Sequence, residues 1–131
     1  MASGLADTSA VIDWDVPGVL EAMPDDIAVS ALTLAELAAG PHLSGDPAER
    51  ARRQVRLQQA ESAFDPIEFD RAAARSFGLI VAAVTASGRS HRSRIVDLLI
   101  AATAHANDLE LYTRNPDDFA GLESLISIRG L

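Results

Sequence analysis

The sequence near the N-terminus reads Leu5-Ala6-Asp7-Thr8-Ser9-Ala10-Val11-Ile12, with an apolar pair on each side of Asp-Thr-Ser. This pattern is typical of a strand that ends where a helix begins, because Asp, Thr and Ser side chains accept hydrogen bonds from the free N–H groups of a helix's first turn. We therefore expect a first strand that ends near Asp7, followed directly by a helix.

Short strand-like runs and longer helical patterns continue to alternate along the chain. Further strands are predicted at 27–30, 109–113 and 125–128, with a brief extended piece at 64–67 that contains Pro66. Helices are predicted at 33–39, 48–63, 69–87 and 93–107, with a loop at 40–47 and a turn of helix at 117–121. The alternation predicts one α/β domain over residues 1–131, built on a parallel sheet.

Composition limits where the protein works. The chain has 131 residues, enough for one self-supporting core, and it contains no cysteine, so disulfides and thiolate zinc sites are excluded. Nothing at residues 1–5 resembles a secretory signal, and the longest apolar run, 95–104, is too short to span a membrane and contains Asp97. We expect a cytoplasmic protein that does not cross a membrane.

The charged residues exclude several classes of enzyme. All eleven basic residues are arginine, so P-loop phosphate binding, Schiff-base chemistry and lysine-assisted phosphoryl transfer are excluded. The net charge of −8 has the wrong sign for a protein that holds nucleic acid by its overall charge. If the substrate is RNA, something must neutralise the carboxylates near it.

Four acidic residues fall near the ends of predicted strands or the starts of helices, where α/β folds place their functional sites. They are Asp7, Glu36, Asp97 and Asp118. If these carboxylates converge, their mutual repulsion would require a cation, and several oxygen ligands from separate elements are the usual way to build a magnesium site. Asp97 is the most informative, because it interrupts an apolar run and a carboxylate there needs a partner.

Each acid also has a purely structural explanation. Asp7 could only cap the first helix, and Glu36 follows Thr33 at the Thr-x-x-Glu spacing of a capping box. Arg94, three residues before Asp97, could form an ion pair with it on one helix face.

The fourth acid, Asp118, is preceded by a second aspartate that could take its role. Asp117 and Asp118 could both be ordinary first-turn acids of a short helix, and either of them could be the fourth acid of a shared site.

Seven of the eleven arginines lie in two short segments, Arg50 to Arg56 and Arg89 to Arg94. Because guanidinium groups bind phosphates through two parallel hydrogen bonds, either segment could hold an RNA backbone beside the carboxylates. For the first segment, a solvated helix face paired with Glu49 and Glu61 is the favoured interpretation. The candidate RNA-binding residues are Arg89, Arg92 and Arg94.

Four motifs in this order resemble the PIN-domain ribonucleases of the VapC toxin type. The motifs are Leu5-Ala6-Asp7-Thr8-Ser9-Ala10-Val11-Ile12, Thr33-Leu34-Ala35-Glu36-Leu37, Val96-Asp97-Leu98-Leu99-Ile100-Ala101-Ala102-Thr103-Ala104 and Thr113-Arg114-Asn115-Pro116-Asp117-Asp118-Phe119. The resemblance covers nearly the whole chain, although Ala6 is smaller than the residue this family often has before its first aspartate.

The resemblance implies a three-layer α/β/α sandwich with a central parallel sheet and an endoribonuclease that depends on Mg²⁺ or Mn²⁺. It places the catalytic and metal-binding roles on Asp7, Glu36, Asp97 and Asp118, with Thr8, Thr113 and Asn115 as supporting polar groups. It also implies the toxin of a type II toxin–antitoxin system, inhibited by a VapB-type antitoxin, that forms homodimers and hetero-oligomers with that antitoxin.

Two other functions remain open from the residues. A PIN-like domain could keep its fold as an interaction module and cleave nothing. The same carboxylates could also serve a metal-dependent phosphatase or a DNA nuclease, because cluster chemistry alone does not specify RNA.

Overall fold

The computed structural model describes residues 2–131, so Met1, the first residue of the predicted domain, lies outside the described part. Its centre is a four-stranded sheet in the order β2-β1-β3-β4, and every neighbouring pair is parallel. The strands are β1 (Gly4–Ala6), β2 (Ile27–Val29), β3 (Glu110–Thr113) and β4 (Ile128–Gly130). The predicted parallel sheet is confirmed.

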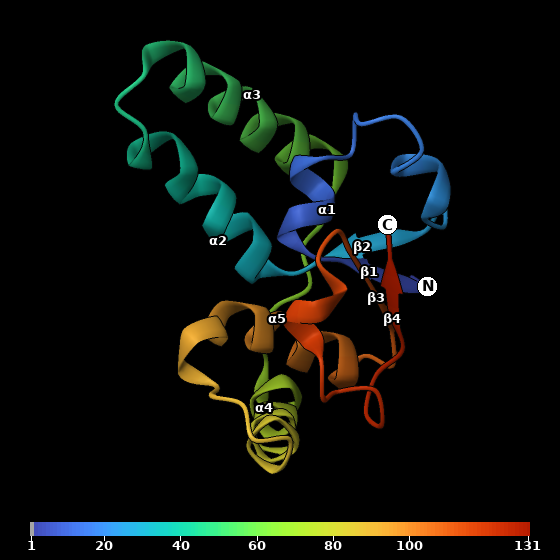
Figure 1. Ribbon diagram of the computed structural model, residues 1–131. Helices are drawn as coiled ribbons and strands as arrows, with labels where there is room; N and C mark the ends of the chain where they lie inside the picture. The colour runs from blue at the N-terminus through green and yellow to red at the C-terminus, as the bar shows by residue number, and fades with distance from the viewer. Residues whose placement is uncertain (1) are drawn as a thin grey trace.

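Helices cover both faces of this sheet, with α1, α2 and α3 on one side and α4 and α5 on the other (Figure 1). The α-helices are α1 (Thr8–Ile12), α2 (Ala31–Ala39), α3 (Pro47–Ala63), α4 (Arg71–Ala86) and α5 (Ile95–Ala106). Four 3-10 turns complete the chain: η1 (Leu20–Ala22), η2 (Gly40–Leu43), η3 (Arg92–Arg94) and η4 (Pro116–Phe119). The three-layer α/β/α architecture is therefore confirmed. No helix within residues 2–131 is long and apolar enough to cross a membrane.

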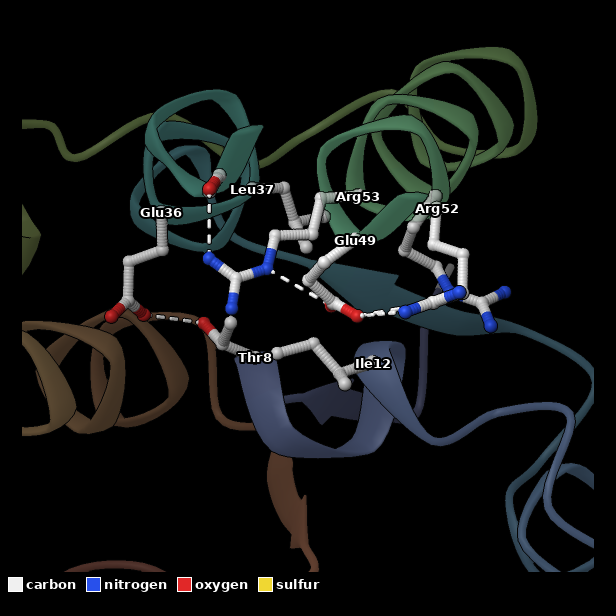
Figure 2. Close-up of a pocket in the computed structure, with 9 residues that line it drawn as sticks. Thr8, Ile12, Glu36, Leu37, Glu49, Arg52 and Arg53 are labelled. Atoms are coloured by element: carbon white, nitrogen blue, oxygen red, sulfur yellow. Dashed lines mark hydrogen bonds and ion pairs between the residues drawn. The ribbon is translucent and has the colours of Figure 1, made fainter. Parts of the chain in front are cut away.

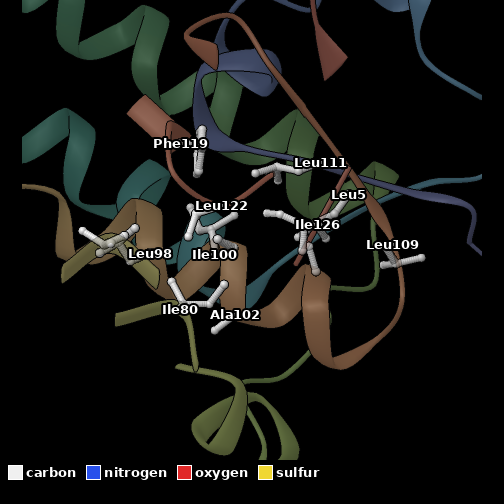
Figure 3. Close-up of a cluster of buried hydrophobic side chains, with 13 residues drawn as sticks. Leu5, Ile80, Leu98, Ile100, Ala102, Leu109, Leu111, Phe119, Leu122 and Ile126 are labelled. Atoms are coloured by element: carbon white, nitrogen blue, oxygen red, sulfur yellow. The ribbon is translucent and has the colours of Figure 1, made fainter. Parts of the chain in front are cut away.

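Two apolar cores form because neighbouring side chains of a strand point to opposite faces of the sheet. Leu5 and Leu111 are fully buried against α4 and α5, in the larger core that Figure 3 shows with Ile80, Ile100 and Phe119. The next residue of β1, Ala6, joins the core under α1, α2 and α3. The sheet is thus buried on both faces, as parallel sheets usually are.

Local sequence explains where most helices begin and end. Asp7, Asp46 and Asp70 each accept a hydrogen bond from a backbone N–H in the first turn of α1, α3 and α4. Gly88, with a φ of +81°, follows the last turn of α4, and the N–H of Arg89 bonds back to the Val84 carbonyl. The predicted end of this helix at Gly88 is confirmed.

The last strand was predicted at 125–128 but lies at Ile128–Gly130. The N–H groups of Leu125 and Ile126 both bond to the carbonyl of Leu122, so this apolar segment forms a turn that packs into the larger core. Its apolar residues are buried by that turn, and periodicity alone does not separate such a turn from a strand.

Two smaller differences concern 3-10 turns. The predicted loop 40–47 begins with η2, and η1 was not predicted. Short 3-10 turns have no repeating apolar pattern long enough to recognise in a sequence.

Candidate active site

The sheet order places the candidate site at one edge. From β1 the chain crosses to β2 on one side, while β3 pairs with β1 on the other, so the connections leaving β1 and β3 diverge. Ligands of parallel α/β sheets bind at such a point, beyond the carboxyl ends of the strands. Asp7 directly follows β1, and Asp118 lies on η4 directly after β3.

Asp7 is 3% exposed and is both a helix cap and a member of the site. Its Oδ1 accepts hydrogen bonds from the Ala10 N–H at 3.0 Å and the Ser9 hydroxyl at 2.6 Å. Burial raises the pKa of Asp7 above its ordinary value, the bonds from Ser9, Thr113 and Ala10 oppose that rise, and the charge of Asp118 adds to it. The capping role suggested by the sequence is therefore real and coexists with a buried carboxylate facing other acids.

Asp97 lies on the first turn of α5, which brings it to the same edge of the sheet. The pKa of Asp97 is raised to about 6, first by burial and then by the charges of Asp118, Asp7 and Glu36, while the charge of Arg94 acts in the opposite direction. Each of the other three acids thus acts electrostatically on Asp97. The four carboxylates predicted from separate motifs lie in one neighbourhood.

Glu36 reaches this neighbourhood from the middle of α2. Its Oε1 accepts a hydrogen bond of 2.5 Å from the Thr8 hydroxyl, which lies on α1 (Figure 2). The capping-box alternative is wrong, because Ser30 caps α2 by accepting a bond of 3.2 Å from the Thr33 N–H. Since Ser30 is the cap, α2 begins at Ala31, two residues before the predicted start.

The structure distinguishes the two neighbouring aspartates of η4. Asp117 is exposed, whereas Asp118 is half-buried and acts on the pKa values of both Asp7 and Asp97. Asp118 also forms an ion pair with Arg94. The sequence had offered Asp97 as the partner of Arg94. The structure shows no ion pair between Arg94 and Asp97, because Arg94 has a non-helical backbone before α5 and its guanidinium pairs with Asp118, although its charge still lowers the pKa of Asp97.

Hydroxyl groups support the acids. Thr8 bonds to Glu36, and the buried Thr113 lowers the pKa of Asp7. Asn115 contributes its backbone N–H, which bonds to the Thr113 hydroxyl at 2.9 Å.

The sequence analysis missed Ser9 as a supporting residue. Besides bonding to Asp7, the Ser9 hydroxyl accepts a bond of 3.0 Å from the Arg114 N–H, joining α1 to the segment after β3. Its place in Asp-Thr-Ser was visible, but its contact with residues more than a hundred positions away was not.

A cavity of about 440 Å³ opens beside Glu36, between α1, α2 and α3. Its apolar surface includes Ile12 and Leu37, while Arg52 and Arg53 both pair with Glu49 (Figure 2). The favoured interpretation of the first arginine segment is thus supported at Glu49, and these two arginines are engaged within the protein.

The remaining arginine of that cavity, Arg56, also contacts other side chains of the protein. Arg56 pairs with Asp15 at 2.9 Å and lies over the ring of Trp14, 4.9 Å from its centroid. Its role in the structure is to join α3 to the segment after α1.

The donors of the site suit a hard divalent cation, since all four are carboxylates and such ions prefer oxygen ligands. Within residues 2–131, however, no three acidic or histidine side chains stand close enough together to hold a metal ion as they are placed. Two of the carboxylates already have polar partners: Thr8 bonds to Glu36, and Arg94 pairs with Asp118. The acids are electrostatically coupled, and their side chains would have to move closer together to share an ion.

The raised pKa of Asp97 predicts a pH effect on the metal-free protein. In the unfolded chain an aspartate loses its proton near pH 3.9, whereas folded Asp97 keeps it up to about pH 6, so the folded state binds more protons in between. The contribution of Asp97 to the free energy of unfolding therefore falls as the pH rises through this window. We expect Asp97→Asn to melt at a higher temperature than the unsubstituted protein at pH 7 in EDTA, and the difference to shrink toward pH 4.

Asp117→Asn is the matched control, because Asp117 is the exposed neighbour of the cluster. Its melting temperature should follow that of the unsubstituted protein at every pH. A difference for Asp97→Asn that stayed constant from pH 4 to 7 would contradict the electrostatic explanation.

Comparisons with known proteins identify the family of this chain. The family model described as "PIN domain" matches residues 5–123. Among curated proteins of Mycobacterium tuberculosis, Ribonuclease VapC8 is 38% identical over 101 residues, 77% of this chain and 89% of that protein. Ribonuclease VapC5 is 34% identical over 129 residues, 97% of this chain and 93% of that protein.

A solved structure resembles the whole fold. The crystal structure of VapBC-5 from Mycobacterium tuberculosis, a member of the VapBC family of toxin–antitoxin systems, contains a chain that matches with a TM-score of 0.82 and 32% identity. The match covers 100% of this chain and 98% of that one.

Proposed function

The chain belongs to the PIN-domain family, and from this membership we propose that it is a VapC-type ribonuclease toxin whose hydrolysis of RNA requires a divalent cation. The ribonuclease assignment follows from relatives named as ribonucleases that match up to 97% of the chain. The requirement for Mg²⁺ or Mn²⁺ is our own inference from the site.

One observation carries the metal requirement: Asp7, Glu36 and Asp118 each raise the pKa of Asp97. Four carboxylates that repel one another at neutral pH form a favourable site for a cation, because the ion removes the repulsion that the folded protein otherwise maintains. The scaffold alternative gives no reason for a protein to hold four acids in this arrangement.

The protein's own groups would hold and orient the reacting partners. Asp7, Glu36, Asp97 and Asp118 would supply the oxygen ligands. Ser9 and the Ala10 N–H keep the Asp7 carboxylate in one orientation, and Thr8 holds Glu36. A bound divalent ion lowers the pKa of water and stabilises negative charge on phosphate oxygens, which is the chemistry that phosphodiester hydrolysis needs.

RNA must approach a protein of net charge −8. Arg89 and Arg92 are exposed on the turn and the η3 segment that precede α5, and α5 carries Asp97. With Arg94, which pairs with Asp118, they remain our candidates for binding the RNA backbone, since guanidinium groups can bind phosphates. Bound cations would add local positive charge at the same edge.

The proposed partner is a VapB-type antitoxin that blocks the site, because the matching structure, VapBC-5, belongs to the VapBC family of toxin–antitoxin systems. A basic antitoxin segment would complement the acidic site and compete with metal and RNA. Homodimers, hetero-oligomers with the antitoxin and a cytoplasmic location complete the proposal.

Metal dependence is tested by incubating the purified chain with single-stranded RNA in EDTA, Mg²⁺ or Mn²⁺ and sequencing the cleaved ends. We expect cleavage with either cation and none in EDTA, restored when the cation is returned. Because water rather than the 2′-hydroxyl is the proposed nucleophile, the products should carry 5′-phosphate and 3′-hydroxyl ends.

Two results would contradict this. Cleavage that persists in EDTA would overturn the metal requirement, and products that end in cyclic phosphates would show that the 2′-hydroxyl rather than water is the nucleophile. A parallel assay on single-stranded DNA and a phosphate monoester distinguishes the ribonuclease from the DNA nuclease and phosphatase alternatives.

A further inference from the structure

Arg94 is a positive charge within the acidic site. It ends η3, directly before α5, and its guanidinium donates a hydrogen bond to Oδ1 of Asp118. It also lowers the pKa of Asp97, in opposition to the three carboxylates that raise it. Within the part of the chain described here, Arg94 therefore acts on two of the four acids.

The carboxylate of Asp118 has two competing uses. An oxygen that accepts a hydrogen bond from a guanidinium is directed toward that group, and a divalent ion brought to the same oxygen would meet the positive charge of Arg94. Both side chains are partly accessible, 39% for Arg94 and 29% for Asp118, so solvent borders the pair and the arginine has room to turn away.

We propose that Arg94 is the internal counter-cation of the acidic site, pairing with Asp118 in the metal-free protein and competing with the divalent ion for that carboxylate. The inference rests on the proposed function, since it requires an ion to bind at the four acids. Arg94 is a positioning residue in this proposal, because it acts through Asp118. When no metal is bound, the positive charge of Arg94 would neutralise part of the negative charge of the four acids.

Competition has a measurable signature in the affinity for metal alone. If Arg94 weakens the binding of the ion by a given factor, thermodynamic linkage requires that the ion weakens the contact between Arg94 and Asp118 by the same factor. We expect Arg94→Gln to bind Mn²⁺ about fivefold or more tightly than the unsubstituted chain, measured by titration calorimetry or from the electron paramagnetic resonance signal of free Mn²⁺. Arg94→Met, a second neutral replacement of similar length, should shift the affinity in the same direction.

Two controls separate competition from a general change in charge. Arg75→Gln removes one positive charge from the exposed surface of α4 and should change Mn²⁺ affinity less than twofold. In an Asp118→Asn background the effect of Arg94→Gln should largely disappear, because the contested carboxylate is gone.

Without metal, Arg94→Gln should also melt at a lower temperature, and Mn²⁺ should raise its melting temperature more than that of the unsubstituted chain.

The outcomes distinguish this inference from the proposed function. If the unsubstituted chain binds Mn²⁺ but both Arg94 variants bind it equally or more weakly, the competition is refuted while metal dependence stands. Tightening by Arg75→Gln to the same extent would also refute it. If the unsubstituted chain binds no Mn²⁺ while remaining folded, the metal requirement itself is overturned.

Discussion

Replacing Asp97 with asparagine is expected to reduce RNA cleavage by about 100-fold or more while the protein still folds and binds its antitoxin. Asparagine has nearly the same shape but no charge, so it removes a proposed metal ligand and leaves the packing of α5 intact. Asp97 is the acid on which the other three act, and its loss removes the centre of the cluster. Initial cleavage rates on a defined RNA in Mn²⁺ measure the effect.

Asp117→Asn provides the control at a neighbouring, exposed aspartate, and it should cleave at a rate within about threefold of the unsubstituted protein. Wild-type rates from Asp97→Asn would exclude Asp97 from the catalytic machinery. If the unsubstituted protein and Asp97→Asn both failed to cleave RNA with any divalent ion, the chain would instead be the interaction module that the sequence left open.

The largest expected effect on stability comes from Phe119→Ala. Phe119 is 1% exposed and lies in the core with Leu98, Leu111 and Leu122 (Figure 3). Truncating a buried phenylalanine costs about 3–5 kcal/mol, a large share of the roughly 5–15 kcal/mol by which domains are stable. We expect the midpoint of urea unfolding to fall accordingly, with an unchanged slope.

The same substitution should also reduce cleavage by the molecules that remain folded, because Phe119 anchors η4 directly after Asp118. Leu43→Ala is the control: Leu43 is 78% exposed, and its loss should change the free energy of unfolding by less than about 0.5 kcal/mol. A loss below about 1 kcal/mol for Phe119→Ala would show that the core collapses around the missing ring.

The order of strands and helices was largely predictable, because it depends on patterns within ten to twenty consecutive residues. The end of β1 before Asp7 and the ends of the long helices α3 and α4 follow from caps and apolar periodicity that a sequence displays directly. The last strand was not predictable in detail, since its position depends on where β3 offers hydrogen-bonding partners.

The candidate site also has residues that the sequence predicted and residues that only the structure revealed. Asp97 could be selected from sequence alone, since a carboxylate within an apolar run requires compensation. The resemblance named Asp118 and left Asp117 as an alternative, and only the structure separates them, because Asp117 is exposed whereas Asp118 acts on the pKa of Asp97. Thr113 was already predicted as a supporting group, whereas Ser9 became one only when folding brought α1 beside the end of β3.

By itself, the sequence determined the α/β class and the approximate elements and named four candidate acids, because these depend on local periodicity, on recognisable motifs and on the cost of burying charge. Only the tertiary structure decided which groups meet: Thr8 with Glu36, Ser9 with Arg114, and Arg94 with Asp118 rather than Asp97. The physical reason is that the first two contacts depend on how α1 packs against α2 and beside β3. The third depends on the non-helical backbone of Arg94 before α5 and on the position of η4, which carries Asp118.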